Sequence, residues 1–100
     1  MDSLSLLILG LFMSAIGITN IKGNISTIHS YNRRKVTEED APKYGKAVGT
    51  GTLIMGVASV VSFFVSFLNP VLVAVIILPS FLVGLGFILY GQFKYNRGIF

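Results

Sequence analysis

Three long apolar segments alternate with polar ones along the chain. The apolar segments cover residues 4–21, 47–68 and 71–91, and none of them contains an Asp, Glu, Lys, Arg or His residue. Because an α-helix rises about 1.5 Å per residue, about 20 apolar residues are needed to cross the hydrocarbon core of a bilayer. The pattern therefore predicts an all-α fold, an integral membrane bundle of three transmembrane helices.

The connection between the second and third apolar segments is very short. Asn69 and Pro70 separate them, and this pair is typical of a turn, with Pro70 also suited to the first turn of the following helix. So short a connection predicts a tight antiparallel hairpin. Residues 1–100 are then a single membrane domain, with a polar loop at 22–46 and a polar tail at 92–100.

The polar loop carries two further signals of helical structure. Isoleucines recur at three- and four-residue spacing into its first part, despite Gly23 and Asn24, and this favours an extension of the first helix. The stripe consists of Ile18, Ile21, Ile25 and Ile28. Near the end of the loop, Asp40 is suited to the N-cap of the second helix and Pro42 to its first turn, where a missing N–H costs little.

The composition also favours a membrane protein. Hydrophobic residues make up 53% of the 100 residues and charged residues only 12%, about half the charged fraction of a typical globular domain. A soluble domain of this size must cover a large surface with polar groups. The absence of cysteine excludes disulfides, a thiolate nucleophile and a Cys-based metal site.

The positive charges predict how the chain sits in the membrane. All eight Lys and Arg residues fall in the loop or in the tail, which lie on the same side of a three-span protein: Lys22, Arg33, Arg34, Lys35, Lys43, Lys46, Lys94 and Arg97. The positive-inside rule makes this side cytoplasmic. Asp2 precedes the first segment and the positive charges follow it, which favours an uncleaved anchor over a signal peptide. We expect a multi-pass protein of the cell membrane, with the N-terminus outside and the C-terminus in the cytoplasm. The net charge of +4 is thereby explained without nucleic acid.

No residues for catalysis, cofactor binding or metal binding stand out. Ion-coupled carriers keep ionisable groups at membrane depth, and the three segments have none. His29 has no second ligand at suitable spacing, and no nucleophile lies beside a base. Glycines at 49, 51 and 56 are not followed by the Lys-Ser/Thr pair of a phosphate-binding loop. We therefore expect a protein that is not an enzyme and that binds no cofactor or metal.

Small residues recur within the apolar segments at spacings that favour helix packing. In lipid, such residues let helix backbones approach closely. The candidate packing residues are Gly10, Ser14, Gly45, Gly49, Ala58, Ser62, Ser66, Ser80 and Gly84. Packing of the chain's own helices accounts for them, and a face for self-association is the alternative. Pro79 lies within the third segment and predicts a kink, with a hinge as the functional alternative.

Three consecutive cations are the most distinctive feature of the loop. Arg33, Arg34 and Lys35 lie beside the bilayer, where each cation contributes about 1 kcal/mol to the attraction of anionic lipid. They also serve as a topology signal, and that role alone is sufficient to explain them. Contact with an anionic headgroup or with a protein partner is the functional hypothesis.

The segment at 28–56 resembles part of a known group of proteins. Its sequence is IHSYNRRKVTEEDAPKYGKAVGTGTLIMG, with an aromatic–basic motif, an acidic helix start and a glycine-rich second helix. It is similar to small bacterial three-span membrane proteins of the DUF3784 type, a domain of unknown function. The resemblance implies a bacterial inner-membrane protein, but it implies no particular activity.

These observations favour a non-enzymatic interaction protein. It would be a small accessory, regulatory or self-associating subunit that packs against a membrane-protein partner or forms a homo-oligomer. The alternative from another class is a small oligomeric channel or permease without an ion-coupling site. Its path would be lined by Thr50, Thr52, Ser59, Ser62 and Ser66.

Overall fold

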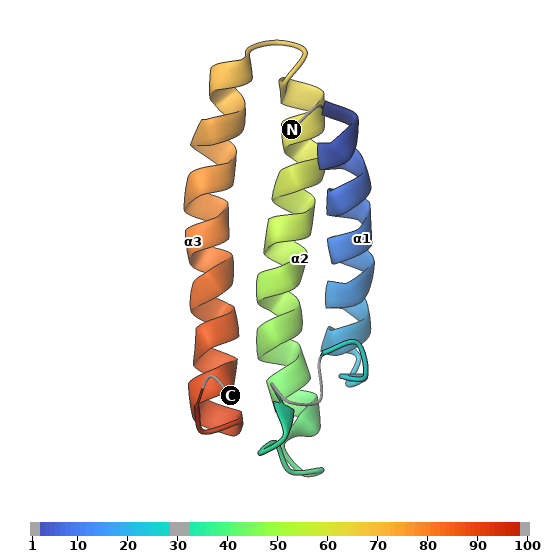
Figure 1. The fold of residues 1–100 in the computed structure, drawn as a ribbon, viewed down its shortest axis with the longest axis vertical. Helices are drawn as coiled ribbons and strands as arrows, with labels where there is room; N and C mark the ends of the chain where they lie inside the picture. Colours follow the sequence, from blue (N-terminus) through green and yellow to red (C-terminus); the bar gives the residue numbers. More distant parts are fainter. Residues whose placement is uncertain (1–2, 29–32, 99–100) are drawn as a thin grey trace.

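The computed structural model describes residues 3–28 and 33–98, which form an up-down-up array of helices (Figure 1). Helix α1 runs from Ser3–Ile21, α2 from Ala41–Val65 and α3 from Pro70–Tyr95. All three are long and apolar enough to cross a membrane. The predicted all-α fold with three membrane-spanning helices is confirmed, and the chain is a small multi-pass membrane protein.

Helix α1 ends at Ile21, and the expected extension to Ile28 is wrong. Gly23 adopts a φ of +104°, a left-handed conformation that glycine tolerates best. The Gly23 N–H donates to the Asn20 carbonyl at 2.9 Å and the Asn24 N–H to the Thr19 carbonyl at 3.2 Å, the hydrogen-bond pattern of a Schellman motif. This cap stops the helix, although the isoleucine stripe continues beyond it.

Helix α2 begins directly after Asp40, with Pro42 in its first turn. The Asp40 side chain makes no capping hydrogen bond; instead its backbone N–H donates to Thr37. Asp40 therefore occupies the predicted N-cap position without the predicted side-chain contact. Because α2 starts at Ala41 and ends at Val65, it includes the turn that precedes the apolar segment at 47–68 and stops before Leu68.

The hairpin between α2 and α3 is closed by the predicted pair. Asn69 has extended backbone angles, and its side chain accepts a hydrogen bond from the Val71 N–H at 3.0 Å. Pro70 is the first residue of α3, where its missing N–H leaves no intrahelical bond unmade. The tight turn thus sets α3 antiparallel to α2, as Figure 1 shows.

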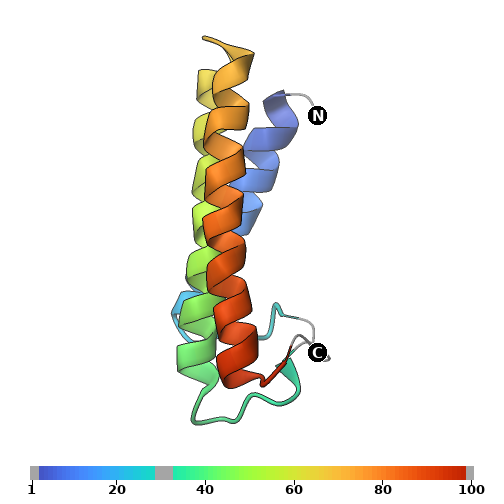
Figure 2. The same cartoon turned by 90° about the vertical axis from the view of Figure 1, so that its left-hand side faces the viewer.

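Helix α2 lies at the centre of the array. It packs against both α1 and α3, whereas α1 and α3 barely touch each other. Figure 2 shows α1 inclined across α2, while α2 and α3 run alongside each other for their whole length. The three helices therefore form an open row rather than a closed triangular bundle.

The outer helices expose most of their apolar side chains. Only 6% of the most apolar window of α3 is buried within the chain, against 44% for α2. In lipid this exposure has no hydrophobic cost, because acyl chains are as apolar as the side chains. Pro79 lies on the exposed part of α3, and the helix continues through it to Tyr95.

Candidate functional site

Close backbone packing of glycines joins α1 to α2. A Cβ added to Gly49 would lie 2.6 Å from the Gly17 carbonyl oxygen, and one added to Gly10 would lie 2.7 Å from that of Gly56. Gly45 is equally confined, against the Asn20 carbonyl. No side chain fits at these separations, so the interface depends on glycine at each position.

A second glycine contact joins α2 to α3. A Cβ on Gly84 would lie 2.8 Å from the Gly51 carbonyl oxygen, and one on Gly51 would collide with the Gly84 carbonyl. Towards the polar end, Gly91 packs against Val48, whose Cγ2 would lie 3.0 Å from an added Cβ. Helix α2 therefore carries glycine on two faces, one for each neighbour.

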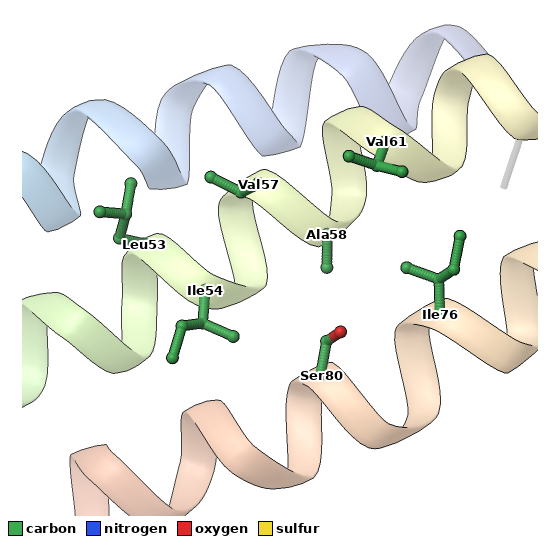
Figure 3. A pocket seen from close by; sticks show the side chains of 7 residues that line it. All are labelled: Leu53, Ile54, Val57, Ala58, Val61, Ile76 and Ser80. Atoms are coloured by element: carbon green, nitrogen blue, oxygen red, sulfur yellow. The ribbon is translucent and has the colours of Figure 1, made fainter.

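The other predicted packing residues lie in several environments. Ser14 contacts Gly56 across the α1–α2 interface. Ala58 and Ser62 are buried on α2. Ser66 lies beyond the end of α2, and its hydroxyl is 3.0 Å from that of Ser3. Ser80 faces an open pocket of about 480 Å³ between α2 and α3, together with Ala58 (Figure 3).

Sequence reasoning missed four glycines that make these contacts: Gly17, Gly51, Gly56 and Gly91. Gly49 and Gly56 lie seven residues apart on α2 and Gly10 and Gly17 seven apart on α1. This heptad spacing returns each glycine to the same helix face. It was available in the sequence but is masked by the tighter four-residue pattern of Gly45 and Gly49.

Buried polar side chains gather at the end of the array that carries the loop and the tail. The Tyr44 hydroxyl donates a hydrogen bond to the Gln92 side-chain oxygen, which connects α2 to α3, and Tyr44 is fully buried. Asn20, at the end of α1, donates to the Asn24 carbonyl at 2.9 Å and to the Thr27 hydroxyl at 2.8 Å. The sequence offered no signal for these hydrogen bonds beyond polar residues at the ends of apolar segments.

The loop is bound to the tail through one buried asparagine. The Asn96 side-chain oxygen accepts a hydrogen bond from the Lys35 backbone N–H at 2.9 Å, and its amide nitrogen donates to the Gly98 carbonyl at 3.0 Å. Asn96 is fully buried. Two segments far apart in the sequence are thus held together beneath the ends of α2 and α3.

The three loop cations differ in their surroundings. The Nε of Arg33 donates to the Ile28 carbonyl at 2.9 Å, so this side chain helps to hold the loop. Arg34 and Lys35 are exposed. The hypothesis of contact with an anionic headgroup or partner therefore applies less well to Arg33 than to exposed Lys35.

The hydroxyl groups expected to line a channel lie against the chain's own backbone. Those of Thr50, Thr52 and Ser59 each donate to the carbonyl four residues earlier. Ser66 donates to the Phe63 carbonyl at 2.6 Å. Ser59 and Ser62 are fully buried between the helices. This arrangement offers no row of exposed hydroxyl groups for a solute path.

An apolar groove separates α1 from α3 at the hairpin end of the array. Its volume is about 480 Å³ and Ser59 of α2 forms part of its wall. The α1 side is formed by Leu6 and Leu9, and the α3 side includes Ala74 and Phe81. The groove exists because α1 and α3 both pack on α2 without closing on each other.

Within residues 3–28 and 33–98, no group of three or more His, Cys, Asp or Glu side chains could hold a metal ion. Asp2 and His29 lie outside the described residues. No protein-family model, curated protein or solved structure matches the chain.

Proposed function

We propose that this small membrane protein is a non-enzymatic accessory or regulatory subunit that associates with a membrane-protein partner or with further copies of itself. The observation that supports it best is the groove between α1 and α3. A row of three helices leaves this groove open, and one further helix placed there would complete a four-helix arrangement. The packing residues on α2 are already occupied within the chain, so association would use the outer helices.

The proposal includes an orientation with the N-terminus outside and the C-terminus in the cytoplasm. The loop and the tail lie at the same end of the array, so their eight cations are all on one side. The opposite end, around Asn69, carries no Lys or Arg. The positive-inside rule then assigns the loop end to the cytoplasm. Exposed Arg34 and Lys35 would meet anionic headgroups or an acidic partner there.

Site-specific photo-crosslinking in native membranes tests the proposed association. A photoreactive residue at Ala74, which lines the groove, should yield a protein adduct of defined mass, either a dimer of the 10.8 kDa chain or a complex with a larger partner. The matched control places the photoreactive residue at Leu82, which is 71% exposed on α3 and lies outside the groove. Lipid adducts and monomer alone at Ala74 would exclude the groove as an association site.

A further inference from the structure

One helical glycine differs from all the others. Gly86 has no atom within 4 Å of the position that an added Cβ would take, whereas every other glycine within α1, α2 and α3 packs against a neighbouring helix. Gly86 instead forms the floor of an open groove of about 420 Å³ on α3, lined by Val83, Phe87 and Tyr90. A glycine within a helix costs about 0.5–1 kcal/mol relative to alanine, and packing within the chain does not explain it here.

A fixed positive charge lies at one end of this groove. The Nζ of Lys94 donates to the Tyr90 hydroxyl at 2.9 Å. It also lies 5.3 Å from the centroid of the Tyr90 ring and 5.7 Å from that of Tyr95. The two rings meet edge to face, with centroids 6.3 Å apart. An ammonium group has three donors, so two remain for another acceptor.

The groove and the cation are parts of one surface. Gly86, Tyr90 and Lys94 follow one another at four-residue spacing, which places them along one face of α3. Tyr90 belongs to both parts, since its ring lines the groove and its hydroxyl binds Lys94. The apolar part lies towards the middle of the helix, and the cation lies in the last turn, at the end that carries the loop and tail.

We propose that this face of α3 is a binding site for an anionic phospholipid. The acyl chain lies in the groove over Gly86, and the headgroup phosphate accepts hydrogen bonds from Lys94 at the membrane surface. An apolar groove that ends in a tyrosine-held cation matches the division of a phospholipid into chain and charged headgroup. Lys94 lies in the last turn of α3, at the level where lipid phosphates lie and where each cation adds to the attraction of anionic lipid, so its position favours the lipid.

Lipid binding to the full-length chain in detergent tests the proposal by native mass spectrometry. The probes are dioleoylphosphatidylglycerol, which is anionic, and dioleoylphosphatidylcholine, which has no net charge. Lys94→Gln should weaken binding of the anionic lipid about fivefold, equivalent to the roughly 1 kcal/mol that one Lys contributes near an anionic surface. It should weaken binding of phosphatidylcholine less, because the choline cation balances the charge of that phosphate. Gly86→Leu should fill the groove and lower the affinity for both lipids severalfold.

Matched variants separate the site from general attraction. Lys43→Gln removes an exposed cation at the same membrane end. Val75→Phe adds bulk at a position of α3 that is 59% exposed and lies outside both grooves. Both variants should bind the lipids as the wild type does. Gly86→Ala should give a smaller loss than Gly86→Leu, and it serves as the groove variant if leucine lowers stability. Lys94→Arg should restore the preference for the anionic lipid.

Each other outcome overturns the site. If Lys94→Gln and Gly86→Leu both bound the lipids as tightly as the wild type does, no lipid site would exist on this face. A loss with Lys94→Gln alone would leave only surface attraction, and a loss with the groove variants alone would leave an acyl groove that does not select a headgroup. Inorganic phosphate that competes as well as the anionic lipid would show that the acyl chain contributes nothing.

Discussion

At the scale of single residues, the effect of a glycine is decided by what lies beyond its Cα. Gly49 faces the Gly17 carbonyl and the Cβ of Asn20, so the space for a side chain is taken by a neighbouring helix. Gly86 faces open space. The two positions are both helical and both in apolar surroundings, yet only Gly49 should lose stability when leucine replaces glycine.

Gly49→Leu should destabilise the protein in detergent. An added Cβ would lie 2.6 Å from the Gly17 carbonyl oxygen, which is backbone and cannot rotate away, so α1 and α2 must separate. Overpacking of this kind costs about 1–3 kcal/mol, occasionally more. Thermal unfolding and the elution volume in size-exclusion chromatography measure the effect, with Gly86→Leu as the matched control that should unfold near the wild-type temperature. Equal unfolding temperatures for Gly49→Leu and the wild type would contradict the close contact.

At the scale of the elements, the sequence was sufficient for the three helices and the hairpin. Length and the absence of charge identify a membrane helix because lipid requires both. The pair Asn69-Pro70 favours a turn between the second and third helices. The isoleucine stripe through Ile28 led to the wrong prediction that the first helix continues through the loop. The backbone conformation of Gly23 ends α1, and the spacing of apolar residues gives no information about that conformation.

The rotation of each helix was the part that the sequence did not determine. In a soluble helix the apolar face identifies the buried side, but in these segments nearly every position is apolar. Gly51 and Gly84 therefore show no sign of facing each other until the helices are placed. The same holds for the bonds from Tyr44 to Gln92 and from Lys35 to Asn96, which join residues 48 and 61 positions apart.

Asn96→Ala should release the loop from the tail without unfolding the helices. The substitution removes the acceptor of the Lys35 N–H and the donor to the Gly98 carbonyl. A hydrogen bond of this kind contributes about 0.5–1.5 kcal/mol, so the Lys35 amide should exchange its hydrogen roughly 2- to 12-fold faster. Amide hydrogen exchange of the protein in detergent checks this.

The control for the loop is Asn69→Ala, which removes the cap of α3 at the opposite end of the array. It should leave the Lys35 exchange rate unchanged while increasing exchange at Val71. If Asn96→Ala left the Lys35 rate at its wild-type value, the loop would be held by other contacts, and Asn96 would have only a role within the tail.

At the scale of the whole molecule, the open row and the one-sided charge belong together. The central helix has neighbours on two sides, and the outer helices meet the surroundings along most of their length. Every cation lies at the end that carries the loop and tail. The molecule therefore has an apolar flank for contacts within the membrane and a polar end for contacts at its surface.

The orientation can be tested directly because the charge difference between the two ends is complete. A reporter fused after Phe100, which lies outside the described residues, should be active only in its cytoplasmic form. One inserted near Asn69, in the exposed hairpin turn, should be active only in its external form. Activity of the opposite kind at either position would reverse the proposed topology.

The basic cluster can then be separated from the topology signal by changing Arg33, Arg34 and Lys35 to Gln together. Five cations remain on the same side and none on the other, so the reporters should show unchanged insertion. The five are Lys22, Lys43, Lys46, Lys94 and Arg97.

If the cluster also binds anionic lipid, vesicles of phosphatidylglycerol should bind the purified triple variant more weakly than the wild type, by up to roughly 3 kcal/mol at about 1 kcal/mol per cation. The difference in vesicle affinity between the wild type and the triple variant should shrink as salt rises, because exposed charges are screened over about 10 Å at 0.1 M salt. Arg33 already donates to the Ile28 carbonyl, so the single variant of exposed Lys35 should lose more binding than the single variant of Arg33. Equal vesicle binding by the wild type and the triple variant at low salt would leave topology as the sole role of the cluster.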